Sequence, residues 1–459
     1  MTSRRSLIAV AAIVLGVVAS VAIASLLGSG GSVSLARPPA FESAPAIAAP
    51  AEPVPQTGRP HVKTWYYYGL NDVNGDVPPD VMVRYADFVE DDGDKVAHAT
   101  MFKRAGGTYA ASYTDPAYVP YCFPPFIGTQ QTCRGQVGKL IHDEGAWFHG
   151  PDGTRVRRFV DAHFGYQQAI NPASPAARKA WRETTEAIER NGPIDIFYAD
   201  DTGGPLHAND MSPRSSEFYD FNAAGVEITS DTVFRDQWVA YLSYAVKPLV
   251  LNGYDPTTGM PSYGGAFLRP SFVWGASHEG CFRRPDGTVK SEGHGDWILE
   301  SNSLLANTAM RKYAMCFMLG TPRPETRVYA LASWWLTYDP QWSVAAPIDP
   351  VPHETALLPE YSIVPASPRT TARDVRELRS ASGAFVREFR ACYQDGRLAG
   401  ACAAVVNPTA HEVAMPRLGT PYARSLLLNA DDVLHGGRAT WVRGVAATIA
   451  PASAAVLAQ

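Results

Sequence analysis

The sequence has few charged residues and no long run of charge of one sign. Only 19% of its 459 residues are Asp, Glu, Lys or Arg, and 40 basic residues stand against 45 acidic ones. Without a cluster of Lys and Arg, the chain lacks the positive surface that nucleic-acid binding requires. A disordered chain would have fewer apolar residues than the 46% found here and a larger net charge than −5, so most of the chain is expected to fold.

Motifs that bind common cofactors and metals are also missing. The sequence contains no P-loop, no nucleophile elbow and no G-x-G-x-x-G after a first strand. Its 11 histidines are scattered, without an H-x-x-x-H or H-E-x-x-H pair. The acidic run at residues 90–94 fits a solvated turn better than a calcium site. The sequence therefore predicts neither a metal nor a cofactor.

Cysteine is scarce, with six residues in the chain and no C-x-x-C pair. This argues against a zinc site or a thioredoxin-like redox site. Proximity in sequence favours two local disulfides, which leaves a third pair; the predicted bonds are Cys122–Cys133, Cys392–Cys402 and Cys281–Cys316. Buried free thiols are the alternative. Disulfides persist in oxidising compartments, so this pattern agrees with export.

Residues 1–28 predict such an export signal. Arg4 and Arg5 precede an uncharged apolar stretch at residues 7–27. A cleaved signal and an uncleaved membrane anchor both fit, because export signals carry ~7–15 apolar residues and ~20 span a bilayer. Residues 3–8 also resemble a twin-arginine signal. In each case the rest of the chain is expected outside the cytoplasm: secreted, periplasmic or tethered to the outer face of the membrane.

After this segment, residues 29–60 are rich in Gly, Ser, Ala and Pro and predict a linker. Residues 61–358 contain short apolar runs that predict strands, alternating with helices at residues 174–191 and 297–312. The strands are expected at residues 64–68, 96–102, 110–113, 194–199, 248–251, 272–276, 313–319 and 328–335. Such alternation favours an α/β fold, a parallel sheet closed into a (β/α)8 TIM barrel, with an open doubly wound sheet as the alternative.

From residue 359 onward the pattern changes to short strands separated by turns. Strands are expected at residues 384–390, 401–406, 425–429, 440–442, 446–449 and 454–457, after a short helix at 373–379. The turns contain Asp395-Gly396, Asn407-Pro408 and Gly436-Gly437. Residues 359–459 therefore predict a C-terminal all-β sandwich domain.

The strongest site signal is the strand at residues 194–199, which ends in Asp200 and Asp201. Glu279 follows a later strand, and Asn252 ends the strand between them. Carboxyl ends of barrel strands meet at the active-site face, so these side chains are expected to converge there. Two carboxylates are what glycosidic cleavage needs: one protonates the leaving oxygen and the other attacks or activates water.

A family resemblance rests on residues 171–201. The run Asn171-Pro172-Ala173-Ser174-Pro175, then Trp181, then the strand from Asp195 to Asp200-Asp201, resembles the signature of extracellular glycoside-hydrolase-like TIM-barrel proteins. The match departs at Ile196, where those proteins have Gly. Asn252-Gly253 and Glu279-Gly280 resemble their fifth- and sixth-strand motifs. The resemblance implies that Asp200 is the nucleophile and Asp201 a supporting acid.

Further polar and aromatic side chains are candidates for sugar contacts, since aromatic faces stack on sugar rings and polar groups take hydroxyls. They lie at predicted strand ends, and they are Tyr66, Asp115, Asn252, His278, Trp334 and Asp339. His278 is expected to be an orienting or structural residue and not a base.

Together these features predict an exported glycoside hydrolase that acts on a polysaccharide or glycoconjugate. The rival interpretation is a non-catalytic carbohydrate-binding or cell-envelope scaffold protein on a barrel. The sequence leaves open the sugar, the linkage, endo or exo action, retention or inversion, the oligomeric state and the choice between Asp200 and Asp201.

Overall fold

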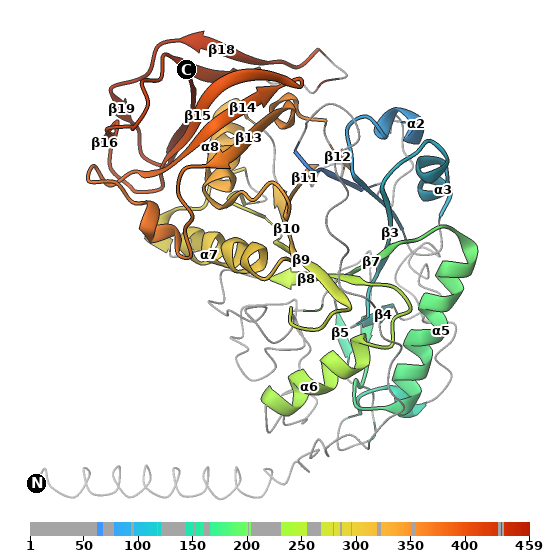
Figure 1. Ribbon diagram of the computed structural model, residues 1–459. Coiled ribbons are helices and arrows are strands. Elements are labelled where there is room, and N and C mark those ends of the chain that lie inside the picture. Colours follow the sequence, from blue (N-terminus) through green and yellow to red (C-terminus); the bar gives the residue numbers. More distant parts are fainter. Residues whose placement is uncertain are drawn as a thin grey trace, which may run out of the picture.

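Figure 1 shows a computed structural model of the chain. The structure describes residues 62–67, 78–92, 96–116, 118–120, 144–149, 153, 155, 157–159, 166–200, 202, 231–254, 268–278, 280–284, 287–294, 296–318, 323–349, 354–355, 357–429, 433 and 436–459. The predicted signal or anchor, the predicted linker, the Cys122–Cys133 pair, Asp201 and Glu279 lie outside these residues.

Eight parallel strands form a closed barrel. In spatial order they are β1 (Trp65–Tyr67), β2 (Phe88–Asp92), β3 (Tyr109–Thr114), β7 (Ile196–Ala199), β8 (Leu249–Tyr254), β9 (Val273–His278), β10 (Tyr313–Met318) and β11 (Ser343–Asp349). A parallel bridge between Thr64 and Ala345 joins the first strand to the last and closes the ring. The predicted barrel is confirmed, and the open-sheet alternative is wrong.

Helices follow most of these strands and cover the outside of the barrel. They are α2 (Pro79–Met82), α3 (Ala97–Arg104), α5 (Pro175–Asn191), α6 (Asp231–Leu242), α7 (Asp296–Ala309) and α8 (Pro324–Thr337). The start of α5 shows why the sequence encodes it: the Ser174 side chain accepts hydrogen bonds from the N–H groups of Ala176 (3.1 Å) and Ala177 (3.4 Å), and Pro175 occupies the first turn.

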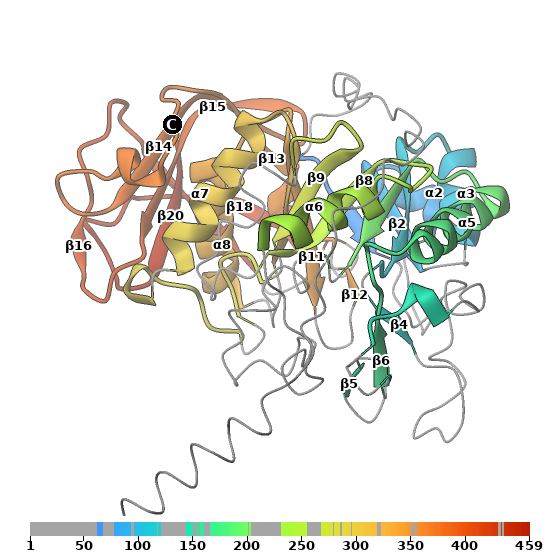
Figure 2. The same ribbon diagram turned by 90° about the horizontal axis from the view of Figure 1, so that it is seen from below.

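A small antiparallel sheet is inserted between β3 and α5. Its strands are β4 (Tyr118–Pro120), β6 (Tyr166–Ala169) and β5 (Arg157–Phe159), in that spatial order. Because β4 begins just after β3 ends, the insertion starts at the carboxyl end of the barrel. In Figure 2 it projects away from the barrel strands.

The C-terminal region is all-β, as predicted. Its larger sheet has the order β13 (Ile363–Pro368), β14 (Phe385–Gln394), β15 (Arg397–Asn407), β20 (Ser453–Ala458), β17 (Arg424–Leu428) and β18 (Ala439–Arg443). A second sheet pairs β16 (Val413–Ala414) with β19 (Thr448–Ile449). A small core that includes Ala403, Val405, Ile449 and Leu457 lies between the two sheets.

The other face of the larger sheet packs on the barrel through α8 (Figure 1). One continuous hydrophobic core contains residues of β10, α7, α8, β14 and β15. Trp335 of α8 meets Phe389 of β14 edge-to-face at 5.8 Å. The buried guanidinium of Arg387 donates to the carbonyl oxygens of Leu336 (2.8 Å) and Tyr338 (3.0 Å). The barrel and the C-terminal sheet therefore share their interior.

Two strand predictions in the barrel are wrong, because residues 96–102 and 328–335 form α3 and α8. In α3 the buried residues are Ala99 and Phe102, three positions apart, as one helix face requires. In α8 eleven of the residues are buried, so the sequence shows no amphipathic period and resembles a buried strand. The strands that complete the barrel are β2 and β11.

Two of the three predicted disulfides are present, Cys281–Cys316 and Cys392–Cys402. The first joins the chain after β9 to β10, with Cα atoms 5.3 Å apart. Within the described residues, no helix has the length and apolarity that a membrane span needs.

Candidate active site

Asp200 lies directly after β7, the fourth barrel strand, at the carboxyl end of the barrel. Its backbone N–H donates to the carbonyl oxygen of Thr114, the last residue of β3 (2.8 Å). Its carboxylate is half-buried and accepts two hydrogen bonds: Tyr113 Oη donates to Oδ2 (2.5 Å), and Asn252 Nδ2 donates to Oδ1 (2.6 Å). Each oxygen is thus fixed by a donor from a neighbouring strand, β3 on one side and β8 on the other. Hydrogen bonds to an ionised acceptor are short and strong, so this carboxylate has a defined orientation.

A chain of hydroxyl and amide groups continues behind Asn252. Ser277 Oγ of β9 lies 2.7 Å from Asn252 Oδ1, and Tyr198 Oη of β7 lies 3.0 Å from Ser277 Oγ. Tyr198, Ser277 and Asn252 are all buried. The backbone around Asn252 is also held, because the Thr202 hydroxyl donates to its carbonyl oxygen.

Aromatic rings fill the barrel beneath Asp200. Tyr198 has ring neighbours Phe317 (5.6 Å), Trp65 (5.9 Å) and Tyr113 (6.1 Å). Tyr67 lies 6.4 Å from Tyr113 and is half-buried near the end of β1. These contacts leave little rotational freedom to the hydroxyl groups that surround Asp200.

The first three residues of the acidic run at residues 90–94 do not form the expected solvated turn but end strand β2, and residues 93 and 94 lie outside the described residues. Glu90 is buried, and its Oε2 accepts a hydrogen bond from Trp65 Nε1 (2.5 Å). Asp91 is buried too; it lies 2.8 Å from His98 Nδ1 and accepts from the N–H of Ala99 (2.8 Å). Because Trp65 lies in the barrel core, Glu90 belongs to the barrel interior and Asp91 to the layer under α3.

His278 points away from the site, contrary to the prediction. Successive side chains of a strand alternate between faces, and Ser277 faces the interior. His278 is therefore on the outer face of β9, where it is fully buried and its Nε2 lies 3.1 Å from Asn307 Nδ2 of α7. Burial, together with the smaller effect of the charge of Lys290, lowers the pKa of its imidazole to about 3. A substrate contact of His278 is incompatible with this position.

The same alternation corrects Tyr66. This side chain packs on the outer face of β1 with Met82, Val89 and Phe102, whereas Tyr67 faces the interior beside Tyr113. Tyr67 is therefore the residue of β1 that lies close to Asp200.

Trp334 and Asp339 were predicted at the carboxyl end of the eighth strand, and the structure places both elsewhere. Trp334 is fully buried in α8, in the core shared with the C-terminal sheet. Asp339 precedes β11 and so lies at the amino end of the barrel; its Oδ1 accepts from the N–H groups of Gln341 (2.8 Å) and Trp342 (3.1 Å). The reason is that β11, and not residues 328–335, is the eighth strand. Both residues therefore have structural roles.

Asp115 follows β3 and is half-buried, next in sequence to the residue that pairs with Ala199. Burial raises the pKa of the Tyr241 hydroxyl, and the charge of Asp115 adds to that rise. Asp115 lies at the same end of the barrel as Asp200. Of the predicted site residues, Asp115, Asp200 and Asn252 thus lie at the same end of the barrel.

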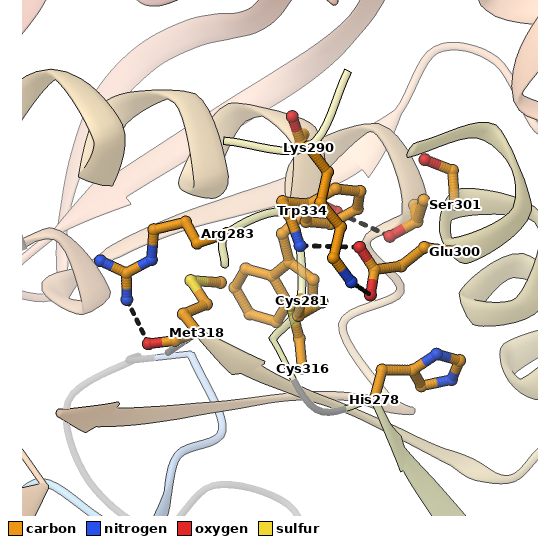
Figure 3. The surroundings of a disulfide bond; sticks show 12 residues. His278, Cys281, Arg283, Lys290, Glu300, Ser301, Cys316, Met318 and Trp334 are labelled. Carbon is orange, nitrogen blue, oxygen red and sulfur yellow. Dashed lines mark hydrogen bonds and ion pairs between the residues drawn. A yellow bond between two sulfur atoms is a disulfide. The ribbon is translucent and has the colours of Figure 1, made fainter. Parts of the chain in front are cut away.

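The chain after β9, which directly follows Glu279 in sequence, is firmly anchored (Figure 3). Besides the disulfide at Cys281, the N–H of Phe282 donates to Glu300 Oε2 (2.7 Å). The ammonium of Lys290 pairs with Glu300 Oε1 at 3.1 Å, and both groups are buried. Burial raises the pKa of the Glu300 carboxyl, while Lys290 and the N–H of Phe282 act against that rise. Arg283 donates to the carbonyl oxygen of Met318.

Tyr113 and Ser277 are site residues that the sequence analysis missed. Alternation along a strand offered part of the signal, because it puts Tyr198 on the same face as Asp200; the inward positions of the neighbouring strands follow only from the register in the structure. Among the described residues, no group of three or more His, Cys, Asp or Glu is arranged to hold a metal ion.

No family model matches the sequence, and no curated protein matches it. Several solved structures of barrel glycosidases are similar to this chain. A β-L-arabinopyranosidase of Geobacillus stearothermophilus is 9% identical with a TM-score of 0.42, covering 87% of this chain and 96% of that chain. A maltogenic α-amylase of Thermotoga neapolitana is 10% identical with a TM-score of 0.40, covering 86% and 98%. Ega3 of Aspergillus fumigatus, crystallised with galactosamine, is 12% identical with a TM-score of 0.31, covering 57% and 79%. The assignment of the fold rests on the strand order and the closing bridge described above.

Proposed function

We propose that this protein is a glycoside hydrolase that cleaves glycosidic bonds of a polysaccharide or glycoconjugate with two carboxylates. The observation that carries the proposal is the carboxylate of Asp200, held between Tyr113 and Asn252 at the carboxyl end of the fourth barrel strand. Active sites of (β/α)8 enzymes are built at this end. A carboxylate fixed through both oxygens is suited to attack a sugar carbon or to activate a water molecule.

The second carboxylate in this proposal is Glu279. In the sequence it directly follows β9, and β8 is the strand between β7 and β9. It also comes two residues after Ser277, whose side chain faces the interior. Asp201, next to Asp200, is proposed as the supporting acid. The separation of the two catalytic carboxyls decides the stereochemistry, since about 5–5.5 Å favours retention and about 6.5–9.5 Å leaves room for an inverting water.

Sugar contacts are proposed from the remaining groups at this end of the barrel. The rings of Tyr67 and Tyr113 offer aromatic faces, and Asp115 and Asn252 offer polar groups for hydroxyls. In this proposal the set replaces the candidates Tyr66, His278, Trp334 and Asp339.

An extracytoplasmic location, with the N-terminal apolar segment as signal or tether, belongs to the same proposal. The two disulfides support it, because such bonds persist in oxidising compartments.

The test is product analysis on a polysaccharide panel with the purified protein and four variants, at Asp195, Asp200, Asp201 and Glu279. Asp200→Asn is expected to lower kcat by at least about 10³-fold, because the amide keeps the shape but is neither nucleophile nor base. Glu279→Gln is expected to be severe on natural substrates and milder on substrates with good leaving groups, which need little protonation. Asp195→Asn is the matched control: this residue begins the same segment, 2.9 Å from Lys103 Nζ, at the amino end of the barrel.

Normal turnover by both Asp200→Asn and Glu279→Gln would refute the assignment. Loss of activity in Asp201→Asn alone would move the key acid by one residue. Saturable sugar binding without product in the unmodified protein would favour the non-catalytic binding or scaffold protein.

A further inference from the structure

We infer that Ser277 is a positioning residue for the Asp200 carboxylate and acts on it through Asn252. Ser277 and Asn252 are the middle members of a one-way hydrogen-bond relay that begins at Tyr198 and ends at Asp200. The catalytic consequence of this inference rests on the proposed function. The relay itself rests on the geometry of four side chains on three adjacent strands, β7, β8 and β9.

The distances define the links. Tyr198 Oη and Ser277 Oγ are 3.0 Å apart, Ser277 Oγ and Asn252 Oδ1 are 2.7 Å apart, and Asn252 Nδ2 and Asp200 Oδ1 are 2.6 Å apart. Tyr198 and Asp200 are two residues apart on the same strand. The relay therefore runs from β7 to β9, then to β8, and returns to the end of β7 at the residue that it orients.

Chemistry fixes its direction. A carboxylate only accepts, so the amide of Asn252 must turn its NH2 group toward Asp200 and its oxygen toward Ser277. That oxygen also only accepts, so the single hydroxyl proton of Ser277 points to it. The backbone oxygen of Leu251 is a poorer acceptor at 3.4 Å. The lone pairs of Ser277 are then left to accept from Tyr198 Oη.

Burial makes the relay effective. Ser277 has 0% of its surface exposed, Asn252 3% and Tyr198 4%, so bulk water does not compete for these groups. The ring of Tyr198 is fixed between Trp65 and Phe317. Without the Ser277 hydroxyl, the oxygen of Asn252 loses this donor, and within the relay the bond to the carboxylate alone still orients the amide.

The kinetic test is Ser277→Ala in the full chain. A positioning residue affects the reacting geometry more than substrate affinity, so kcat is expected to fall at least tenfold while KM stays within about twofold. Tyr198→Phe removes the first donor of the relay, and its kcat is expected to fall by a smaller factor than that of Ser277→Ala. The matched control is Ser301→Ala, which deletes another fully buried hydroxyl, donated to Trp297 O in α7 (2.8 Å). Its kcat is expected to equal that of the unmodified protein.

A second readout does not depend on activity. The side-chain amide of Asn252 is observed by ¹⁵N NMR and assigned by the loss of its signals in Asn252→Asp. Both amide protons are expected to shift in Ser277→Ala and in Tyr198→Phe and to stay unchanged in Ser301→Ala.

Unchanged Asn252 signals in both relay variants would overturn the relay, whatever the kinetics. A kcat of Ser277→Ala equal to that of Ser301→Ala would overturn the positioning role. If the unmodified protein turns over no sugar while the amide signals shift as expected, the relay stands and the proposed function alone fails.

Discussion

Among single residues, His278 shows how the barrel wall controls protonation. It lies behind β9, fully buried, with Asn307 as a partner and the charge of Lys290 nearby. Burial penalises the charged imidazolium, which is why its pKa falls to about 3. The side chain is therefore neutral at every pH at which the protein is expected to act, and it is a structural group.

This burial predicts acid sensitivity. In the unfolded chain the imidazole has a pKa near 6.5, above the folded value of about 3, so between these limits the unfolded state binds more protons. The contribution of His278 to the unfolding free energy is therefore fully present above pH ~6.5. It is lost as the pH falls toward ~3, by up to about 1.4 kcal/mol per pH unit. The His278→Gln variant keeps a polar group for Asn307. Between pH 7 and pH 5 it is expected to lose less unfolding free energy than the unmodified protein. Urea unfolding of both proteins at the two pH values measures the difference, and equal losses would contradict the assignment.

At this scale the sequence predicted part of the site. Asp200 and Asn252 follow apolar strands, and that position is readable without a structure. Tyr66 and His278 were chosen one residue away from inward-facing neighbours, Tyr67 and Ser277. The face of each side chain depends on where its strand enters the barrel, and an apolar run that is buried on both faces does not reveal this.

At the scale of elements, contacts with two neighbouring elements hold the segment after β9 in place. The disulfide at Cys281 attaches it to β10, and Glu300 of α7 binds the next residue, Phe282. An element that follows a proposed catalytic residue is thereby fixed to two neighbours. Its rigidity is expected to support the geometry of the site.

Removal of this disulfide tests that role. The double variant Cys281→Ala/Cys316→Ala is expected to lose about 2–4 kcal/mol of unfolding free energy and to lower kcat. The matched control, Cys392→Ala/Cys402→Ala, removes the other described disulfide, which joins β14 to β15 in the C-terminal sheet. It is expected to lose stability but to keep kcat. Urea denaturation and steady-state kinetics measure both effects; equal kcat values for the two double variants would count against the anchoring role.

Helices and strands of this fold differ in how well the sequence predicts them. The helix α5 was predicted within one residue because Ser174, Pro175 and Gly192 mark its ends. The strand β2 was missed because its second half is acidic, and its carboxylates are accommodated by Trp65, His98 and the N–H of Ala99. Those partners are distant in sequence or belong to the next helix, so local pattern carries no trace of them.

At the scale of the whole molecule, the barrel and the C-terminal sheet form one hydrophobic interior. Helix α8 contributes to both sides, and the buried ion pair of Arg327 with Glu360 joins α8 to the segment before β13. An interface this apolar does not separate without exposing its core. The two parts are therefore expected to unfold together.

Calorimetry measures this cooperativity. The full chain is expected to show a single transition with equal calorimetric and van't Hoff enthalpies. Trp335→Ala is expected to destabilise by about 3–5 kcal/mol and to lower the midpoint of that one transition. Leu427→Ala is the control, because Leu427 is 56% exposed on β17 and its truncation is expected to change little. A second transition, or a shift confined to one of two transitions, would show independent units.

The bridge that closes the barrel has a consequence for the order of folding during synthesis. Lys63, just before β1, donates to Pro340, 277 residues later in the chain. At about 5–20 residues per second, a ribosome needs roughly 15–55 s to make that stretch, and throughout this time the first strand lacks one of its two neighbours. Both cysteines of the Cys281–Cys316 bond emerge before Pro340, so this bond is able to form while the ring is still open. A chain that forms this bond early would hold β9 and β10 together before β11 is added, and reducing conditions are expected to slow the appearance of the closed barrel.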